Sequence, residues 1–154
     1  MEMPKPSDAH KKLLKLVGRW NGEEKLYPSP WDPTGGMAKG LAVNKAELDG
    51  FFVVQDYQQE RNGRINFRGH GVFGWDQFEN CYVVHWFDSM GTPPQVMKGT
   101  FENSVLSLVG KFPQGFNRGI WDYSKEGKVT FKMEVSMDGK NWQPMMEGNY
   151  TKER

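Results

Sequence analysis

Turn-forming residues recur along almost the whole chain, and they limit its fold more than any other feature. Asp49-Gly50, Asn62-Gly63 and Asp138-Gly139 are two-residue pairs that favour β-hairpin turns, because such turns need positive φ angles. The 18 glycines and 9 prolines are spread through the 154 residues rather than gathered in a tail. This distribution predicts many short segments joined by tight turns, and it argues against a helical bundle.

Between the turns the polar and apolar residues alternate, as expected of strands. An N-terminal helix followed by a long antiparallel meander closes most simply into a barrel, since closure leaves no exposed strand edge. We therefore expect an all-β fold, an up-and-down antiparallel barrel of about ten strands with one short N-terminal helix. The expected strands are residues 19–27, 37–48, 51–61, 64–75, 81–88, 96–102, 104–110, 117–124, 128–136 and 142–151.

The expected helix lies at the start of the chain. Ser7 is a suitable N-cap, Asp8 favours the positive end of the helix dipole, and Gly18 is a suitable stop. A helix of about three turns is not stable alone, so it must pack against the barrel. We expect residues 1–6 to be a disordered tail and residues 7–154 to form a single domain.

Composition excludes several classes of function. The formal net charge is +1, so no overall field attracts nucleic acid or an anionic membrane. The chain contains no apolar run of about 18 residues and no signal-peptide stretch, which predicts a cytoplasmic protein. A lone cysteine, Cys81, excludes an intramolecular disulfide and a multi-cysteine zinc site, and we expect no metal.

Turn geometry predicts which side chains share a face of the barrel. A two-residue turn at Asp49-Gly50 places Asn44 opposite Gln55 and Ala42 opposite Tyr57. The turn at Asn62-Gly63 would then place Tyr57 opposite Arg68 and Gln55 opposite His70. An even loop over 76–80 keeps His70 and His85 on one face, whereas a one-residue slip reverses every side chain.

Lysines on the strand over 37–48 indicate which face is outside, because Lys39 and Lys45 are costly to bury. The opposite face would line the barrel and bind a ligand, with polar groups set in an apolar wall. Its expected ligand-binding side chains are Phe51, Val53, Gln55, Tyr57, Arg68, His70, Val72, Val83, His85 and Phe87.

The same assignment puts a stripe of aromatic residues on the outside, too large to leave exposed to water. It comprises Phe52, Phe73, Tyr82 and Trp86. The stripe is either covered by the N-terminal helix or a loop, or it is the interface of a homodimer.

His70 and His85, with Tyr57 and Arg68, form the most reactive-looking cluster. Without a carboxylate on their face, two histidines make a poor zinc site. They can belong to a structural polar network, orient a ligand, or act as an acid–base pair in an enzyme. We expect binding rather than catalysis, and Arg68 favours an anionic or carbonyl-bearing ligand.

Gly18-Arg19-Trp20, after a short helix and at the head of the first strand, resembles the Gly-x-Trp signature of the calycin superfamily of lipocalin-like barrels. The resemblance implies that Trp20 closes one end of the barrel. It also implies that Trp20 packs against a basic residue of the last strand, here Lys152 or Arg154.

A longer set of motifs resembles the bacterial domain-of-unknown-function family 1579, from residue 7 onward. These motifs are Pro28-Ser29-Pro30-Trp31-Asp32-Pro33, Asp49-Gly50-Phe51-Phe52, Gly69-His70-Gly71-Val72-Phe73-Gly74-Trp75-Asp76, His85-Trp86-Phe87-Asp88-Ser89-Met90-Gly91, Met133-Glu134-Val135-Ser136 and Asn141-Trp142. The resemblance implies a calycin-like barrel without an activity to transfer.

Related barrels carry lipophilic ligands or bind haem. The nitrobindin-like barrels hold haem through a histidine of the C-terminal strands, but this chain has no histidine after His85, so haem would need His70 or His85. Arg118 and Tyr150 do not match the carboxylate-binding motif of fatty-acid-binding barrels. We expect a barrel without a resident cofactor that binds a lipophilic or anionic small molecule.

Overall fold

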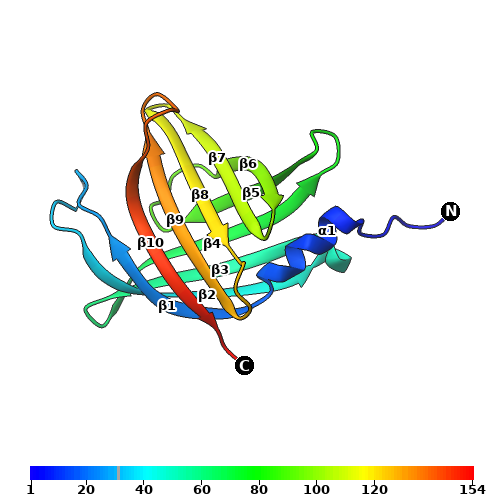
Figure 1. Cartoon of the computed structure of the whole chain (residues 1–154), viewed down its shortest axis with the longest axis horizontal. Coiled ribbons are helices and arrows are strands. Elements are labelled where there is room, and N and C mark those ends of the chain that lie inside the picture. Colours follow the sequence, from blue (N-terminus) through cyan, green and yellow to red (C-terminus); the bar gives the residue numbers. More distant parts are fainter. Residues whose placement is uncertain (31) are drawn as a thin grey trace.

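Ten antiparallel strands form a closed barrel in which each strand pairs with its sequence neighbours and β1 pairs with β10 (Figure 1). The structure, a computed structural model, describes residues 1–30 and 32–154. The strands are β1 (Gly18–Leu26), β2 (Gly36–Glu47), β3 (Phe52–Arg61), β4 (Arg64–Asp76), β5 (Cys81–Asp88), β6 (Gln95–Glu102), β7 (Val105–Phe112), β8 (Gly115–Asp122), β9 (Lys128–Ser136) and β10 (Gln143–Lys152). The sequence-based prediction of the fold is confirmed, and every strand boundary lies within two residues of its expected position.

The N-terminal helix is also present, in two parts. Helix α1 (Asp8–Lys12) starts at Ser7, whose side chain and backbone both bond to Nδ1 of His10, and the 3-10 turn η1 (Leu13–Leu16) continues it. The chain becomes extended at Val17, so Gly18 opens β1 and is not the helix stop that we expected. Within the described residues, no helix is long and apolar enough to cross a membrane.

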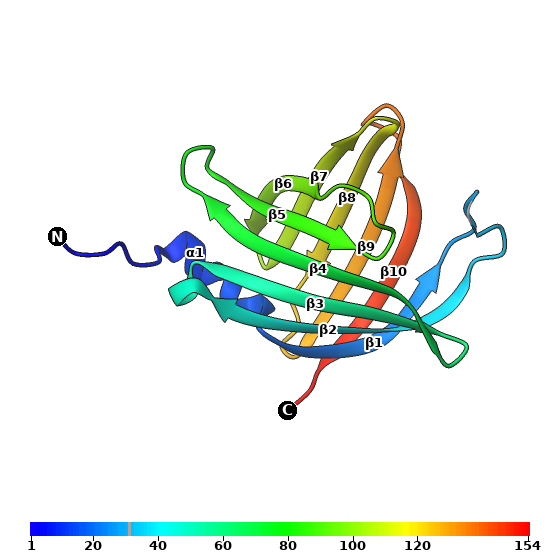
Figure 2. The ribbon, with the colours of Figure 1, turned by 180° about the vertical axis from the view of Figure 1, so that it is seen from behind.

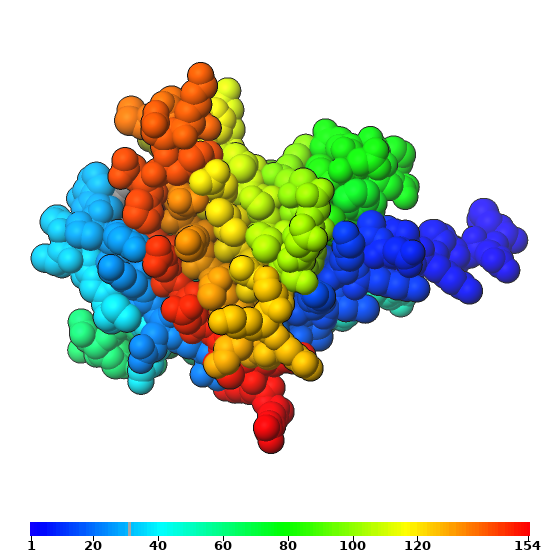
Figure 3. All heavy atoms as spheres, viewed as in Figure 1, coloured from blue at the N-terminus to red at the C-terminus, as the bar shows by residue number. Residues whose placement is uncertain are grey.

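The helix closes one end of the barrel, where the N-terminal segment projects from the body of the molecule (Figure 3). Leu13 and Leu16 of η1 are fully buried there. The backbone oxygen of Leu16 accepts hydrogen bonds from Nε1 of Trp20 at 2.9 Å and from Nδ2 of Asn44 at 2.8 Å. Lys152 places Nζ 5.8 Å from the centre of the Trp20 ring, so Lys152 is the expected basic partner of this tryptophan.

Packed apolar side chains fill the barrel beneath the helix. Tyr82 ties the wall to the helix, because its hydroxyl donates to the backbone oxygen of Ala9 at 2.7 Å. The buried residues of this packed end are Leu13, Leu16, Trp20, Ala42, Val53, Phe73, Tyr82, Val84, Met97, Phe101, Leu106, Leu108, Tyr123, Val129 and Tyr150.

The predicted register between β2 and β3 is confirmed. Asn44 pairs with Gln55 and Ala42 with Tyr57, and the chain turns between the two strands at η2 (Leu48–Gly50), where all three residues have positive φ. Asn44 and Gln55 are both buried, so this face points into the barrel as expected.

The register between β3 and β4 differs from the prediction by one residue, and this changes the facing of both β4 and β5. Gln59 pairs with Phe67 but the next residue, Glu60, pairs with Ile65, so Asn66 is an extra residue that forms a β-bulge. Beyond the bulge, Tyr57 pairs with Gly69 rather than with Arg68. Figure 2 shows these strands side by side.

The bulge reverses every side chain beyond it, because strand side chains alternate between the two faces. The expected inward facing of part of the candidate site is therefore wrong. The residues that lie on the outer face instead are Arg68, His70, Val72, Val83, His85 and Phe87. The loop over 77–80 is even, since Asp76 pairs with Cys81, so His70 and His85 do share a face as predicted.

The same reversal removes most of the expected outer aromatic stripe. Phe73 and Tyr82 are buried inside the barrel, and Trp86 points inward from β5. Phe52 alone of the four stays on the outer face, where its ring covers Gly74. Phe73, Tyr82 and Trp86 are thus covered by the barrel itself, whereas Phe87 is exposed on the outer face.

We expect Leu16→Ala to destabilise the protein by about 2–5 kcal/mol, because the leucine is fully buried and its loss leaves a cavity under the helix. Leu14→Ala is the matched control, since Leu14 is 47% exposed in the same turn and should change stability by less than about 0.5 kcal/mol. Urea unfolding followed by circular dichroism measures both. Equal effects of the two changes would show that the helix does not seal the barrel end.

Candidate functional site

The interior of the barrel opposite the helix is lined by side chains that are only partly buried. They point inward, as the pairing of Trp121 with fully buried Leu106 shows for β8. Solvent can reach inward-pointing side chains only through the end of the barrel that the helix leaves open. We call this region the open half and define it by Tyr57, Phe67, Trp86, Trp121, Phe131, Met133 and Met146.

Aromatic rings dominate the open half. The ring centres of Trp121 and Phe131 lie 4.8 Å apart, and that of Tyr57 lies 6.3 Å from Trp86. Trp86 crosses the inward face of Gly69, where an added Cβ would overlap its ring. The Trp86 indole is held in place because Nε1 donates to the Asp88 carboxylate at 2.9 Å.

A completely buried carboxylate, Glu24, lies at the inner limit of the open half. It points inward because it is four residues after Trp20 on β1, and its exposed fraction is 0%. Tyr57 donates to this carboxylate at 2.6 Å, Nε2 of Gln59 donates at 3.0 Å, and the Tyr150 hydroxyl also donates to it. We call these four residues the Glu24 cluster.

The Glu24 cluster contains no positive side chain. Among the described residues, no Lys, Arg or His forms an ion pair with Glu24. Its three donors are neutral, whereas an ionised carboxylate can accept about four hydrogen bonds. Burying a carboxylate without a cation is costly, so the cluster is an acceptor site with capacity for a further donor or a positive charge.

Glycines make the space for this cluster. An added Cβ at Gly40 would overlap the Glu24 carboxylate and lie 2.9 Å from the Tyr150 ring. An added Cβ at Gly148 would overlap the Tyr150 hydroxyl. Gly40 lies on β2 and Gly148 on β10, the two strands that pair with β1. Neither residue has a side chain that would occupy the space of the cluster.

The two tyrosines remain neutral hydrogen-bond donors over a wide pH range. Burial raises the pKa of Tyr57 and of Tyr150 far above the ordinary value, and the neighbouring Glu24 carboxylate raises both further. Because the phenolate form is disfavoured, both hydroxyls stay protonated and donate hydrogen bonds to the Glu24 carboxylate.

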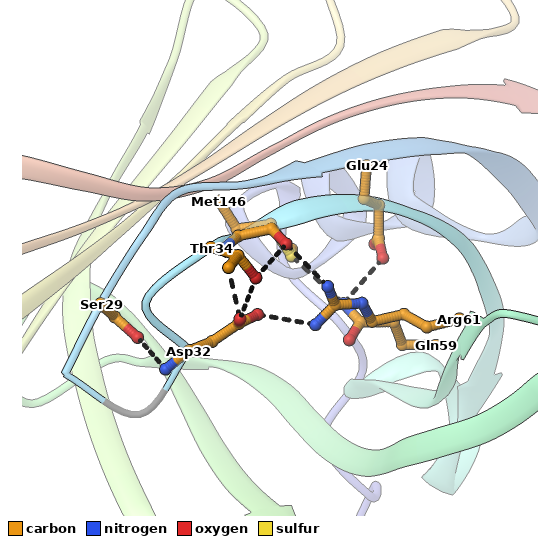
Figure 4. Close-up of polar contacts among 8 residues, drawn as sticks. Glu24, Ser29, Asp32, Thr34, Gln59, Arg61 and Met146 are labelled. Atoms are coloured by element: carbon orange, nitrogen blue, oxygen red, sulfur yellow. Dashed lines mark hydrogen bonds and ion pairs between the residues drawn. The ribbon is translucent and has the colours of Figure 1, made fainter.

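The loop between β1 and β2 is tied to the wall beside the Glu24 cluster (Figure 4). Arg61 donates to the Asp32 carboxylate at 2.7 Å and to the backbone oxygen of Gly35 at 2.9 Å. This contact lowers the pKa of Asp32. Arg61 is two residues after Gln59 on β3, so the loop lies at the mouth of the open half; Trp31 of the family motif lies outside the described residues.

Asn117 adds a second polar group to the interior. Its side chain is 95% buried on β8, and its Nδ2 lies 3.5 Å from Oε1 of Gln95. Its amide oxygen has no hydrogen-bond partner among the described residues. A buried amide oxygen of this kind can accept a hydrogen bond from a molecule inside the barrel.

Three of the expected ligand-binding residues, Val53, Gln55 and Tyr57, point inward; Val53 belongs to the packed core and Tyr57 to the open half. Phe51 instead packs against the His10 ring at the helix end, with ring centres 5.0 Å apart. The exposed outer residue His70 bonds to the Asp56 carboxylate at 2.8 Å. In the part of the chain that the structure describes, no three His, Cys, Asp or Glu side chains gather in a metal-binding group.

Sequence reasoning missed Glu24, Gln59 and Tyr150. The signal for Glu24 was available, since a two-residue period from Trp20 through Gly22 places it inside. Tyr150 does not match a motif for a ligand carboxylate, and the carboxylate to which it donates is Glu24 of the chain itself.

We predict that Tyr150→Phe lowers stability at pH 7 by about 1–3 kcal/mol, because Glu24 loses a donor. It should also flatten the alkaline loss of stability. A pKa raised in the folded state contributes stability that is complete below the ordinary value of 10.0 and is lost as the pH rises above it. Each such tyrosine steepens this loss by about 1.4 kcal/mol per pH unit, and the variant lacks one.

Urea unfolding at several pH values between 8 and 11 measures this slope. Tyr27→Phe is the control, since Tyr27 is outside the Glu24 cluster and the change should alter the slope less. Identical slopes for the wild type and Tyr150→Phe would contradict a buried hydrogen bond between Tyr150 and Glu24.

Two examples illustrate the solved structures that share the barrel. Rv2717c from M. tuberculosis superposes with a TM-score of 0.73 at 13% sequence identity, over 96% of this chain and 99% of that chain. The S-type phycobiliprotein lyase CPES from Guillardia theta superposes with a TM-score of 0.63 at 5% identity, over 96% of this chain and 94% of that chain. At these identities the similarity shows the fold alone.

No curated protein matches the chain in sequence. The family model described as "Protein of unknown function (DUF1579)" matches residues 5–152. This match covers nearly the whole barrel and agrees with the motifs in the sequence. The chain therefore belongs to the DUF1579 family of proteins of unknown function.

Proposed function

We propose that the protein binds a small, largely apolar molecule in the open half of the barrel. The observation that carries the proposal is the partial exposure of inward-pointing aromatic and methionine side chains opposite an end that the helix seals. Inward-pointing apolar side chains that contact water are stabilised when an apolar molecule replaces that water.

The dimensions of the barrel support this proposal. Barrel diameter grows with strand number, and barrels of about eight strands already hold either packed side chains or one small ligand. Ten strands give a wider interior, in which Tyr57, Trp121 and Phe131 pack against the core of the helix end and stay partly exposed. A few polar groups among apolar walls, here the Glu24 cluster and Asn117, are typical of sites that orient one ligand.

The solved relatives support the proposal only through their shape. One of them is named a phycobiliprotein lyase, so a barrel of this shape can serve a specific biochemical task. At 5% identity no residue role carries over to this chain, and the choice of ligand must come from the interior itself.

The two alternative functions lose the residues on which they depended. Acid–base catalysis inside the barrel needed His70 or His85 in the interior, and both lie on the outer face. Haem held inside the barrel needed the same histidines. Since neither points inward, no observation in the described residues favours these alternatives over binding.

Nile red, a neutral apolar dye, tests the proposal. We expect its fluorescence to rise and shift to the blue on addition of the folded protein, because the dye leaves water for the aromatic interior. Met133→Trp should weaken this binding by about tenfold, or 1.4 kcal/mol, since the larger ring fills the open half.

Lys132→Trp is the matched control, because it places the same ring on the exposed outer face of the same strand. It should leave the affinity for Nile red within about twofold of the wild type. An unchanged dye spectrum with the folded wild type, or equal losses in both variants, would contradict binding in the open half.

A further inference from the structure

We propose that the ligand of this barrel is an organic cation or another strong N–H donor with an aromatic or apolar body, and not a carboxylate. This inference rests on the proposed function and specifies its ligand class. It reverses the expectation drawn from Arg68, which lies on the outer face and cannot hold an anion inside.

The first argument for a cationic ligand is the charge of the inner wall. Among the described residues, the inward-facing charged side chains of the open half and its mouth are Glu24, Asp88, Arg61 and Arg64, the last of which pairs with Arg61 near the tip of the β3–β4 hairpin. Arg61 is already bound to the Asp32 carboxylate, so these two charges cancel. Arg64 is exposed, so solvent screens its charge, and the two carboxylates deeper in the barrel give the interior a negative field that attracts a cation and repels an anion.

The low polarity around Glu24 strengthens this preference. The carboxylate is completely buried, and its three donors are neutral. Charges interact more strongly in such surroundings than in water. A cation close to Tyr57 would therefore be attracted by the charge of Glu24. A ligand carboxylate at the same place would be repelled by Glu24 and would also lose its hydration.

The second argument for a cationic ligand is the aromatic wall of the open half. Tyr57 and Trp86 face one another near Asp88, and Trp121 and Phe131 continue the aromatic wall. The face of an aromatic ring is electron-rich and attracts ammonium groups by about 0.5–2 kcal/mol each. Rings combined with carboxylates are the chemistry that recognises a bulky ammonium ion, and here Asp88 lies beside Trp86 while Glu24 lies beneath Tyr57.

Three naphthalene probes of one size separate charge from apolar contact: 1-naphthylmethylammonium, 1-naphthylmethanol and 1-naphthoate. We expect calorimetry on the full chain at pH 7 to rank their affinities in that order. The ammonium probe should bind at least about tenfold more tightly than the carboxylate, which corresponds to 1.4 kcal/mol.

Glu24→Gln should remove most of the preference for the ammonium over the alcohol, while the affinity for the alcohol changes by less than about twofold. Glu23→Gln is the matched control, because it removes the same charge from the adjacent, exposed residue on the outer face. Asp88→Asn lies at the partly exposed mouth and should reduce the preference by about two- to threefold. It keeps the test decisive if Glu24→Gln fails to fold.

The outcomes separate this inference from the proposed function. Equal binding of naphthoate and the ammonium probe, or Nile red binding without any binding of the ammonium probe, would overturn the cation preference and leave the binding barrel standing. If neither Nile red nor any naphthalene probe binds, the proposed function fails and the ligand class fails with it.

Discussion

One extra residue in β4 determines what this barrel contains. In a closed barrel every side chain faces either the interior or the solvent, so the register between two strands fixes the contents of both faces. The bulge at Asn66 places Phe73, Tyr82 and Trp86 inside and leaves His70 and His85 outside. The Asn66 bulge thereby makes the interior aromatic and acidic instead of basic.

The Glu24 cluster depends on the regular pairing of β1 with β2 and β10 and of β2 with β3. Tyr57 and Gln59 reach Glu24 from β3, on the helix side of the bulge, while Tyr150 reaches it from β10 on the other side of β1. Gly40 and Gly148 leave the space that the carboxylate and the tyrosine occupy. The buried Glu24 carboxylate is held by neutral donors and lies beside the partly exposed rings of the open half. The packing of the barrel therefore determines which ligand it would bind.

Turn residues were enough to predict the strands, because positive-φ glycines and asparagines mark the hairpins directly. The same reasoning predicted the pairing of Asn44 with Gln55, where no bulge intervenes. It failed after Asn66, since no turn rule announces a bulge inside a strand. A warning was present, however: the wrong register exposed Phe73 and Trp86, whose burial stabilises the barrel far more than burying His70 would.

The pairing of β3 with β4 is the most direct test of this account, because both the interior and its charge follow from it. Backbone nuclear Overhauser effects in isotope-labelled protein measure the pairing. The account predicts cross-strand contacts of Tyr57 with Gly69 and of Asp56 with His70. Contacts of Tyr57 with Arg68 and of Gln55 with His70 would contradict it, since the histidines would then line the barrel.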